Sequence, residues 1–379
     1  MMHQPEVIFQ LLRSHGIDLF TGVPDSLLKD FCAYVTDSVP AKEHIIAANE
    51  GNAIAIAAGH YIGTGHPALV YMQNSGVGNA INPLLSLADP EVYSLPMLLM
   101  IGWRGEPGTK DEPQHVKQGR VMSALLDALE IPWYELSANT EDVADLIGSA
   151  VAQMEERKSP IAILVRKGAF QKYSLRQKKI SRFNMSREQA IKTLVDYLAP
   201  SDLVVSTTGM ASRELYELRV KAQQGHSNDF LTVGAMGHTG SIALGLAKGQ
   251  VDRKVFCIDG DGSILMHMGA MGVIGCSGVK NLVHIAINNG AHDSVGGQPT
   301  VGFDIDFPKI AESCNYAHSF SVDGSDDLSE CLMRSRQLDG PVFIEVRVNK
   351  GSREDLGRPV STPKENKSAL MALIRSDSA

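Results

Sequence analysis

The chain has 379 residues, of which 44% are hydrophobic, and its formal net charge at neutral pH is −8. This length and apolar content suit two domains, each with a sizeable core. The acidic balance and the lack of a long basic stretch argue against a protein that binds nucleic acid or anionic membranes.

The cysteines and the apolar runs indicate the compartment. The five cysteines are scattered and form no Cys-x-x-Cys pair, which favours a reducing cytoplasm over a disulfide framework or a zinc site. Residues 1–16 lack the pattern of a secretory signal, and the longest apolar run, around 95–101, is too short to span a bilayer. We therefore expect a cytoplasmic protein with no membrane or nucleic-acid partner.

Short β-rich runs alternate with helix-like stretches along the whole chain. The first expected strands are 18–21, 44–47, 68–71, 97–101 and 161–165, with helices such as 51–62 and 121–129 between them. The same rhythm returns in the second half, with expected strands at 203–206, 254–258, 282–287 and 342–348. This alternation predicts an α/β fold of two doubly wound domains, each a parallel sheet with helices on both faces.

A polar and basic stretch, 173–185, separates the two halves and is predicted to be a linker. Ser186 begins a new helix with Ser-Arg-Glu-Gln, which is typical of a capping box. We therefore expect one domain at residues 1–172 and a second at residues 186–379. The charged segment from Lys350 onward contains prolines and glycines, and is either a lid or a plain tail.

Two polar motifs follow consecutive expected strands of the second half. The first is Gly-Asp-Gly at 260–262, and the second is Asn-Asn at 288–289. Glycines on both sides of Asp261 permit a tight turn, and open α/β folds bind ligands at the carboxyl ends of their strands. If the strands are neighbours, Asp261 and an asparagine oxygen converge beside Ser263, where a helix start would favour phosphate. Such oxygens suit Mg²⁺ shared with a diphosphate.

Other phosphate-binding motifs fit this stretch less well. A dinucleotide site would require Gly-x-Gly-x-x-Gly, but residue 265 is leucine, and a Walker loop would require a Gly-Lys-Ser/Thr that is absent. For Gly-Asp-Gly alone, a tight turn without a ligand is the alternative. Together, the two motifs resemble the fingerprint of thiamine-diphosphate-dependent enzymes.

The resemblance to thiamine-diphosphate-dependent 2-oxo-acid decarboxylases extends over almost the whole chain. It implies that residues 1–172 bind the pyrimidine end of the cofactor and residues 186–379 its diphosphate end, with no middle domain. In this family the two sites usually come from different subunits, so the resemblance also implies self-association into at least a dimer. Within HIIAANEGNAIAIAAGHYIGTG, Glu50 resembles the family's activating glutamate, a role that a pKa raised by burial would suit.

Further cofactor contacts follow from the same resemblance. LTVGAMGHTGSIALG is similar to the family's segment beneath the thiazolium ring, and STTGM to a diphosphate-binding turn. The implied cofactor-binding residues are Glu50, Gly234, Met236, Thr208, Gly209, Gly262 and Ser263, and the implied Mg²⁺ ligands are Asp261, Asn289 and Ala291. A core methionine is the alternative for Met236, and a plain strand-end turn is the alternative for STTGM.

The short architecture resembles the phosphonopyruvate and sulfopyruvate decarboxylases, and FTGVPDSLLKDF, MIGWRGEPGTKDEPQHVKQG and NNGAHDSVGGQPT favour the first family. The implied reaction converts 3-phosphonopyruvate to phosphonoacetaldehyde and CO₂ through a thiamine diphosphate adduct, in phosphonate biosynthesis. The substrate is a small anionic 2-oxo acid, so cations should contact it. Arg104 and Lys110 are the candidates, unless both are solvated surface charges, and Arg353 and Arg358 of the tail are weaker ones.

Catalysis also requires groups that hold protons. Asp25 corresponds to the family's N-terminal catalytic aspartate, and His115 stands where related decarboxylases keep a histidine; a helix cap and a surface histidine are the alternatives. The glutamate that pyruvate decarboxylases carry after Asn-Asn-Gly is missing here, so His292 and Asp293 are local candidates for the final proton donor. His267 and His284 are expected mid-helix and mid-strand, with structural roles.

The alternative functions differ in class. A sulfopyruvate decarboxylase would act on a related anion, whereas a regulatory subunit would bind thiamine diphosphate without catalysis. The presence of both Glu50 and the Asp261/Asn289 pair argues against the second alternative.

Overall fold

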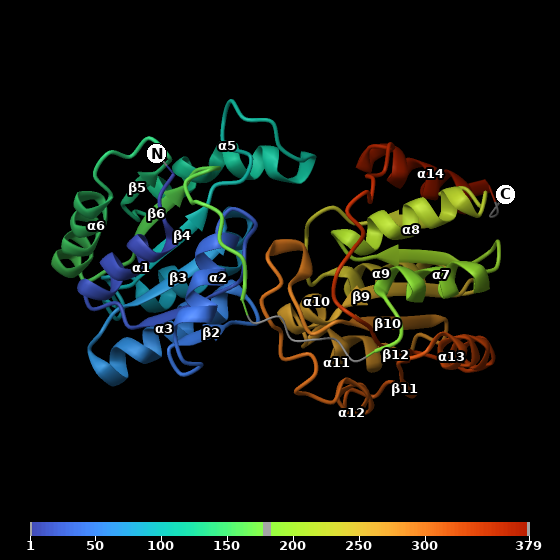
Figure 1. The fold of residues 1–379 in the computed structure, drawn as a ribbon. Coiled ribbons are helices and arrows are strands. Elements are labelled where there is room, and N and C mark those ends of the chain that lie inside the picture. The colour runs from blue at the N-terminus through green and yellow to red at the C-terminus, as the bar shows by residue number, and fades with distance from the viewer. Residues whose placement is uncertain (1, 177–182, 377–379) are drawn as a thin grey trace. The chain divides into compact units, whose positions relative to one another are not determined.

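The computed structural model describes residues 2–176 and 183–376. Its contacts divide the chain into two compact units (Figure 1): unit 1 comprises residues 1–178 and the short segment 294–298, and unit 2 comprises residues 179–293 and 299–379. The predicted linker, 173–185, includes residues 177–182, which lie outside the described residues. The domain boundaries at 172 and 186 therefore stay predictions.

Unit 1 is built on one six-stranded sheet in the order β2-β1-β3-β4-β6-β5, and every pairing in it is parallel. The strands are β1 (Leu19–Gly22), β2 (His44–Ile46), β3 (Ala68–Gln73), β4 (Leu98–Gly102), β5 (Trp133–Leu136) and β6 (Ile161–Val165). The helices are α1 (Pro5–Ser14), α2 (Lys29–Ser38), α3 (Glu50–Thr64), η1 (Asn74–Gly76), α4 (Val77–Pro83), η2 (Leu84–Ala88), α5 (Pro113–Ala128) and α6 (Val143–Arg157).

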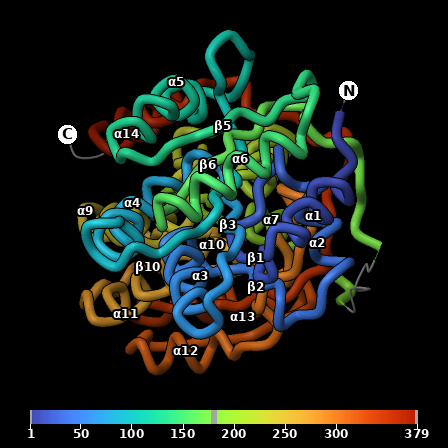
Figure 2. The backbone as a smooth tube through the Cα atoms, turned by 90° about the vertical axis from the view of Figure 1, so that its left-hand side faces the viewer, coloured from blue at the N-terminus to red at the C-terminus, as the bar shows by residue number. Residues whose placement is uncertain are grey.

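Helices cover both faces of this sheet, and its central strands are therefore buried on both sides. Side chains of α1, α2 and α6 pack with one set of strand residues, and those of α3, α4 and α5 pack with the alternate set. Figure 2 shows α1 and α2 on one side of β1 and β3, and α3 and α4 on the other. This is the arrangement expected for continuous apolar strands in a parallel sheet.

Unit 2 has a second six-stranded sheet, in the order β11-β12-β10-β9-β7-β8, again with parallel pairings throughout. Its strands are β7 (Leu203–Ser206), β8 (Asp229–Leu231), β9 (Val255–Gly260), β10 (Leu282–Asn288), β11 (His318–Val322) and β12 (Val342–Arg347). Its helices are α7 (Arg187–Tyr197), α8 (Met210–Lys221), α9 (Thr239–Gly249), α10 (Asp261–Met266), α11 (Ala270–Gly275), α12 (Phe307–Ser313), α13 (Ser325–Gln337) and α14 (Pro363–Ser376). The short helix η3 (Asp293–Val295) includes residues assigned to both units.

The two faces of the second sheet are covered separately. Helices α7, α8 and α13 contribute to one apolar cluster, and α9, α11, α12 and α14 contribute to the other. The predicted α/β class, with two doubly wound parallel sheets and no middle domain, is therefore confirmed.

Each expected strand is confirmed, with ends that differ by at most two residues. Strands β5, β8 and β11 were not expected from the sequence, and each of them is an edge strand of its sheet. Most residues of β5 and β11 are incompletely buried, and β8 has three residues. Edge strands are short and polar because only one side pairs, so they lack the apolar run that marks a central strand.

Residues at the first turn determine where two of the predicted helices begin. The capping box at Ser186 is confirmed, because its side chain accepts from the Gln189 amide and Gln189 returns the contact to the backbone of Ser186. The helix expected at 121–129 begins earlier, at Pro113, a residue whose fixed φ suits the first turn. Within the described residues, no helix is both long enough and apolar enough to cross a membrane.

The aromatic cluster around Phe343 gives the fold a testable anchor. Phe343 is fully buried on β12, and its ring lies 5.7 Å from that of Tyr316 and 6.4 Å from that of Phe307, measured between ring centroids. We expect Phe343→Ala to lower the free energy of unfolding by about 3–5 kcal/mol, because it removes buried surface and leaves a cavity. Urea denaturation followed by circular dichroism measures this. The control, Val251→Ala at a side chain that is 69% exposed, should change it by less than about 0.5 kcal/mol; equal effects would contradict the packing.

Candidate active site

In unit 1, polar residues follow the carboxyl ends of neighbouring strands. Asp25 follows β1, Glu50 follows β2, Asn74 follows β3 and Arg104 follows β4. Because these strands are adjacent and parallel, their carboxyl ends meet at the same edge of the sheet, where open α/β folds bind ligands.

Glu50 is the first residue of α3 and is 5% exposed. The helix begins there because the Asn49 side chain accepts a hydrogen bond from the Asn52 amide at 2.9 Å. Asn79 Nδ2 donates to Glu50 Oε2 at 2.8 Å, and any Cβ at Gly76 would collide with the carboxyl group. Burial raises the pKa of Glu50, although the Asn79 hydrogen bond opposes this. The carboxyl group is thus able to hold a proton at a higher pH than a free glutamate.

Asp25 is completely buried. Its Oδ2 accepts hydrogen bonds from the amides of Leu27 at 2.8 Å and Leu28 at 3.2 Å. Its Oδ1 is buried without a hydrogen-bond partner among the described residues. Burial raises the pKa of Asp25 to about 6, while the Leu27 amide and the charge of Arg104 oppose the shift. Leu28 is the residue that precedes α2 and its side chain makes no cap, whereas the two amide contacts of Asp25 Oδ2 are those of a capping side chain on the turn before α2.

Arg104 lies beside Asp25 but its guanidinium already has partners. Nε donates to Asp111 Oδ2 at 2.8 Å, Nη2 donates to the other Asp111 oxygen, and Nη1 donates to Ser26 Oγ at 2.7 Å. Lys110 of the same loop is exposed, and none of the described residues forms an ion pair or hydrogen bond with its side chain. The two predicted substrate cations therefore differ: Arg104 is fixed, and Lys110 is available.

His115 lies in the first turn of α5. Burial lowers its pKa to about 4, with a further contribution from the charge of Arg104. Its Nδ1 is buried and has no hydrogen-bond partner in the described part of the chain. The imidazole is therefore neutral at neutral pH, so it can accept or pass on a proton.

In unit 2, Asp261 lies where β9 passes into α10. The helix begins at Asp261, with Gly260 as its cap, and not at Ser263 as expected. Asp261 is 3% exposed, and its Oδ2 accepts a hydrogen bond from the Thr300 hydroxyl. Burial raises the pKa of Asp261 to about 6, whereas the Thr300 hydroxyl opposes the shift.

Asn288 ends β10 and Asn289 follows it, and the two amide groups have different partners. Asn288 is fully buried, and its Nδ2 donates to the Gly302 carbonyl at 2.6 Å and to Glu345 Oε1 at 2.8 Å, so it holds the following loop. Asn289 Oδ1 accepts one hydrogen bond, from the Ala291 amide at 3.0 Å. A carbonyl oxygen has two lone pairs, so Asn289 retains one for a ligand.

The loops after β7, β8 and β9 are joined by two hydroxyl groups. Ser263 Oγ accepts from the Gly237 amide at 3.1 Å and lies 3.3 Å from Thr207 Oγ1. Thr208 Oγ1 accepts from the Gly234 amide at 2.8 Å. Ser263 and Thr208 therefore hold the strand ends together, and the hydroxyl proton of Thr208 is left to donate.

The segment between β8 and α9 is strained. Gly234 and Gly237 both have φ of 87°, and Ala235 has φ of 49°, which is unfavourable for a residue with a side chain. This bent backbone places the Met236 methyl group 3.5 Å from the position of a Cβ at Gly262. Met236 thus lies at the Gly-Asp-Gly turn, not within the apolar core clusters.

The start of α8 is open to an anion. Gly209 has φ 94° and ψ −136°, a conformation that glycine tolerates, and no side chain caps the helix. The first amides of α8 are therefore not occupied by a cap, which suits a phosphate group.

Two protein-family models match this sequence, one in each half of the chain. A model described as "Thiamine pyrophosphate enzyme, N-terminal TPP binding domain" matches residues 2–130. A model described as "Thiamine pyrophosphate enzyme, C-terminal TPP binding domain" matches residues 207–346. The chain belongs to the thiamine pyrophosphate enzymes.

Three relatives match nearly the full length of this thiamine pyrophosphate enzyme. A phosphonopyruvate decarboxylase of Streptomyces viridochromogenes is 35% identical, with 92% of this chain and 89% of that protein covered. A phosphonopyruvate decarboxylase of Streptomyces hygroscopicus is 36% identical, with 92% and 88% covered. A sulfopyruvate decarboxylase of Methanosarcina acetivorans is 27% identical, with 97% of each chain covered.

Arg353 of the tail, a weaker candidate for the substrate, already has partners. Arg353 Nε pairs with Glu188 at 2.9 Å, Nη1 pairs with Asp355 at 3.0 Å, and Nη2 pairs with Glu217. Arg353 therefore attaches the tail to α7 and α8.

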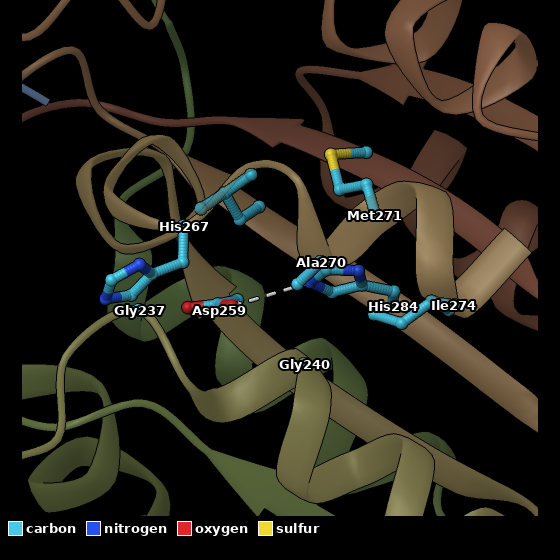
Figure 3. A pocket seen from close by; sticks show the side chains of 9 residues that line it. Gly237, Gly240, Asp259, His267, Ala270, Met271, Ile274 and His284 are labelled. Atoms are coloured by element: carbon cyan, nitrogen blue, oxygen red, sulfur yellow. Dashed lines mark ion pairs between the residues drawn. The ribbon is translucent and has the colours of Figure 1, made fainter.

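Three further side chains of metal-binding type lie together in unit 2. Ligand atoms of Cys257, Asp259 and His284 all lie within 4.8 Å of one another. Figure 3 shows Asp259 and His284 at a small cavity that His267 also lines. His284 contacts the Tyr316 hydroxyl at 2.9 Å and lies 3.5 Å from Asp259, and burial raises the pKa of the Cys257 thiol well above its usual range. These side chains therefore contact one another in the buried interior of unit 2.

The expectation for the two structural histidines is correct for one position and wrong for the other. His284 lies mid-strand in β10, as predicted. His267 caps the end of α10 instead of lying inside a helix, because that helix ends at Met266.

Three residues that shape the site were not singled out from the sequence. Asn79 holds Glu50, Asp111 fixes Arg104 and Thr300 donates to Asp261. Asp111 and Thr300 lie in stretches that carry the family resemblance, but no local pattern identified their partners.

The buried Asp25 predicts a specific dependence of stability on pH. Because its pKa is about 6 in the folded protein and 3.8 in the reference state, the folded state binds more protons between these values, and stability falls as pH rises through this window. The neutral side chain of Asp25→Asn does not titrate. We therefore expect the free energy of unfolding of this variant, minus that of the unsubstituted protein, to increase by up to about 3 kcal/mol from pH 4 to pH 7.

Urea denaturation of both proteins at the two pH values measures this gain. Asp145→Asn, the same change at an exposed carboxyl group of unit 1, is the matched control. An equal stability difference at pH 4 and pH 7 for Asp25→Asn would contradict the prediction.

Proposed function

We propose that this chain is a thiamine diphosphate- and Mg²⁺-dependent decarboxylase that converts 3-phosphonopyruvate to phosphonoacetaldehyde and CO₂, as a step of phosphonate biosynthesis. The observation that carries the proposal is the identity of 35% and 36%, over 92% of the chain, to two proteins named phosphonopyruvate decarboxylase. The buried acids of unit 1 and the oxygen donors of unit 2 support the same chemistry.

The residues of unit 2 fit a diphosphate held through a divalent ion. Asp261 offers a carboxylate and Asn289 offers an amide oxygen with a free lone pair, both hard ligands that Mg²⁺ accepts. The carbonyl of Ala291 is the proposed third protein ligand. The proposed cofactor contacts are the diphosphate-binding Thr208, Gly209, Gly262 and Ser263, with Gly234 and Met236 on the segment before α9.

When bound, thiamine diphosphate would supply a cationic thiazolium ring able to accept the electrons of the breaking C–C bond. Decarboxylation replaces a carboxylate with a proton, so the protein must deliver one proton for each CO₂ that leaves. We assign activation of the cofactor to Glu50, whose buried carboxyl group can exchange a proton with the pyrimidine ring. Asp25, with its pKa of about 6, can hold a proton near neutral pH, and the neutral His115 can pass one on.

Binding of the anionic substrate is assigned to two cations. Lys110 is exposed on a glycine-rich loop, and we propose that it contacts the phosphonate. Arg104 would contact it by giving up its bond to Ser26 while Asp111 keeps the guanidinium in place. The fixed guanidinium also supplies positive charge beside Asp25.

We further propose that the protein self-associates, with active sites at the subunit interface, as the family resemblance implies. We propose a cytoplasmic location because all five cysteines are unpaired, which suits a reducing compartment. The alternative substrate is sulfopyruvate, which the similarity to a sulfopyruvate decarboxylase over 97% of the chain favours.

A substrate panel tests the proposed reaction. We expect the purified protein, with Mg²⁺ and thiamine diphosphate, to release CO₂ and aldehyde from phosphonopyruvate with a kcat/KM at least about tenfold above those for sulfopyruvate and pyruvate, a difference equivalent to about 1.4 kcal/mol. Protein stripped of metal by a chelator is the control. An equal or higher kcat/KM for sulfopyruvate would transfer the assignment to the alternative substrate.

Glu50→Gln tests the proposed activation. We expect decarboxylation to fall by at least about 100-fold, because glutamine cannot exchange the proton, while the affinity for thiamine diphosphate, measured by calorimetry, changes only a few-fold. Glu141→Gln, at an exposed position of unit 1, is the matched control and should keep full activity. Near-normal turnover by Glu50→Gln would falsify the assigned role.

A further inference from the structure

Asp293 lies directly beside the proposed metal ligand Asn289. Its Oδ2 accepts hydrogen bonds from Asn289 Nδ2 at 3.2 Å, from the Gly351 amide at 2.7 Å and from Arg187 Nη1 at 3.3 Å. The sequence made Asp293 a candidate for the final proton donor, but these three contacts place its Oδ2 against Asn289, α7 and the segment after β12.

The arginine that contacts Asp293 is itself held in place. Arg187, the first residue of α7, forms a two-bond pair with Glu214 of α8: Nε donates to Oε2 at 2.8 Å and Nη2 donates to Oε1 at 2.9 Å. Arg187 is 6% exposed and Glu214 is 1% exposed. Paired fork geometry fixes both the position and the direction of a guanidinium, so Nη1 is presented to Asp293 by a rigid support.

The contact decides which end of the Asn289 amide is free. With Nδ2 donating to Asp293, Oδ1 receives the Ala291 amide and keeps one lone pair. A reversed amide would place Oδ1 against the carboxylate of Asp293 and Nδ2 against an N–H donor, and both contacts would be repulsive. The hydrogen bonds at the two ends therefore support the same orientation.

We propose that Asp293 is a positioning residue that orients the Asn289 oxygen for the metal ion, supported by the Glu214–Arg187 pair and by the Gly351 amide. This inference rests on the proposed function, since it needs Asn289 to be a metal ligand. Gly351 lies in the segment that follows β12, and Arg187 Nη2 also approaches its carbonyl at 3.4 Å. Through the Gly351 amide, the start of the C-terminal tail thus helps to hold Asp293 in place.

Titration of the protein with Mg²⁺ tests whether Asp293 positions the metal ligand. The Mg²⁺ affinity of the metal-free protein is measured by calorimetry at saturating thiamine diphosphate. We expect Asp293→Ala to weaken it by about 10–100-fold, the range typical of residues that orient metal ligands. Asp293→Asn should weaken it less, because its amide oxygen can still accept from Asn289. Arg187→Lys, which loses the two-bond pair with Glu214, should also weaken it.

A second readout separates positioning from proton transfer. For a positioning residue, kcat at saturating Mg²⁺ should return to within a few-fold of the unsubstituted value, whereas the Mg²⁺ concentration for half-maximal activity rises. Asp323→Ala removes an exposed carboxylate elsewhere in unit 2 and should leave the Mg²⁺ affinity unchanged. Thermal unfolding of the metal-free proteins checks that each variant is folded. If Asp293→Ala does not fold, the Mg²⁺ affinity of Asp293→Asn decides whether Asp293 is a positioning residue.

Two outcomes would overturn the inference: an unchanged Mg²⁺ affinity in the folded Asp293 variants, or a loss of kcat that saturating Mg²⁺ does not restore. The unsubstituted protein separates this from failure of the proposed function. If it binds Mg²⁺ and thiamine diphosphate but does not decarboxylate phosphonopyruvate, the proposed reaction fails and the binding titration still decides the role of Asp293. If it binds neither, both proposals fail.

Discussion

A buried carboxyl group is stable only where neighbouring groups compensate for the water it has lost, and this constraint shapes both candidate sites. Glu50, Asp25 and Asp261 are each at most 5% exposed, and each lies just beyond the end of a parallel strand. Burial raises the pKa of all three. Hydrogen bonds from an amide side chain, backbone amides or a hydroxyl group limit the shift in each case.

Close backbone approach is the second condition for these sites. Gly76 lies against the carboxyl group of Glu50, Gly102 against that of Asp25 and Gly302 against that of Asp261. A side chain at any of these positions would displace the acid. The sites therefore combine polar residues that are costly to bury with glycines that leave no other space for them, as expected where function is favoured over stability.

Unit 2 also shows how a ligand set depends on residues that touch no ligand. The oxygens of Asn288 and Asn289 each accept one backbone amide, from Gly290 and Ala291 respectively. Their Nδ2 groups have different partners: Asn288 donates to Gly302 and Glu345, and Asn289 donates to Asp293. Carboxylates that touch no ligand thus fix the direction of both amides.

The sequence by itself determined the α/β class, all the central strands and the two strand-end motifs, because apolar runs and glycine-flanked acids are local properties of the chain. It did not reveal the edge strands β5, β8 and β11, whose polar composition reflects one-sided pairing. Only the tertiary structure decided that Asn79 donates to Glu50, that Thr300 donates to Asp261, and that Arg353 pairs with Glu188 and Glu217. These contacts join residues that are far apart in the sequence, and their proximity depends on how strands and helices pack, which no local pattern encodes.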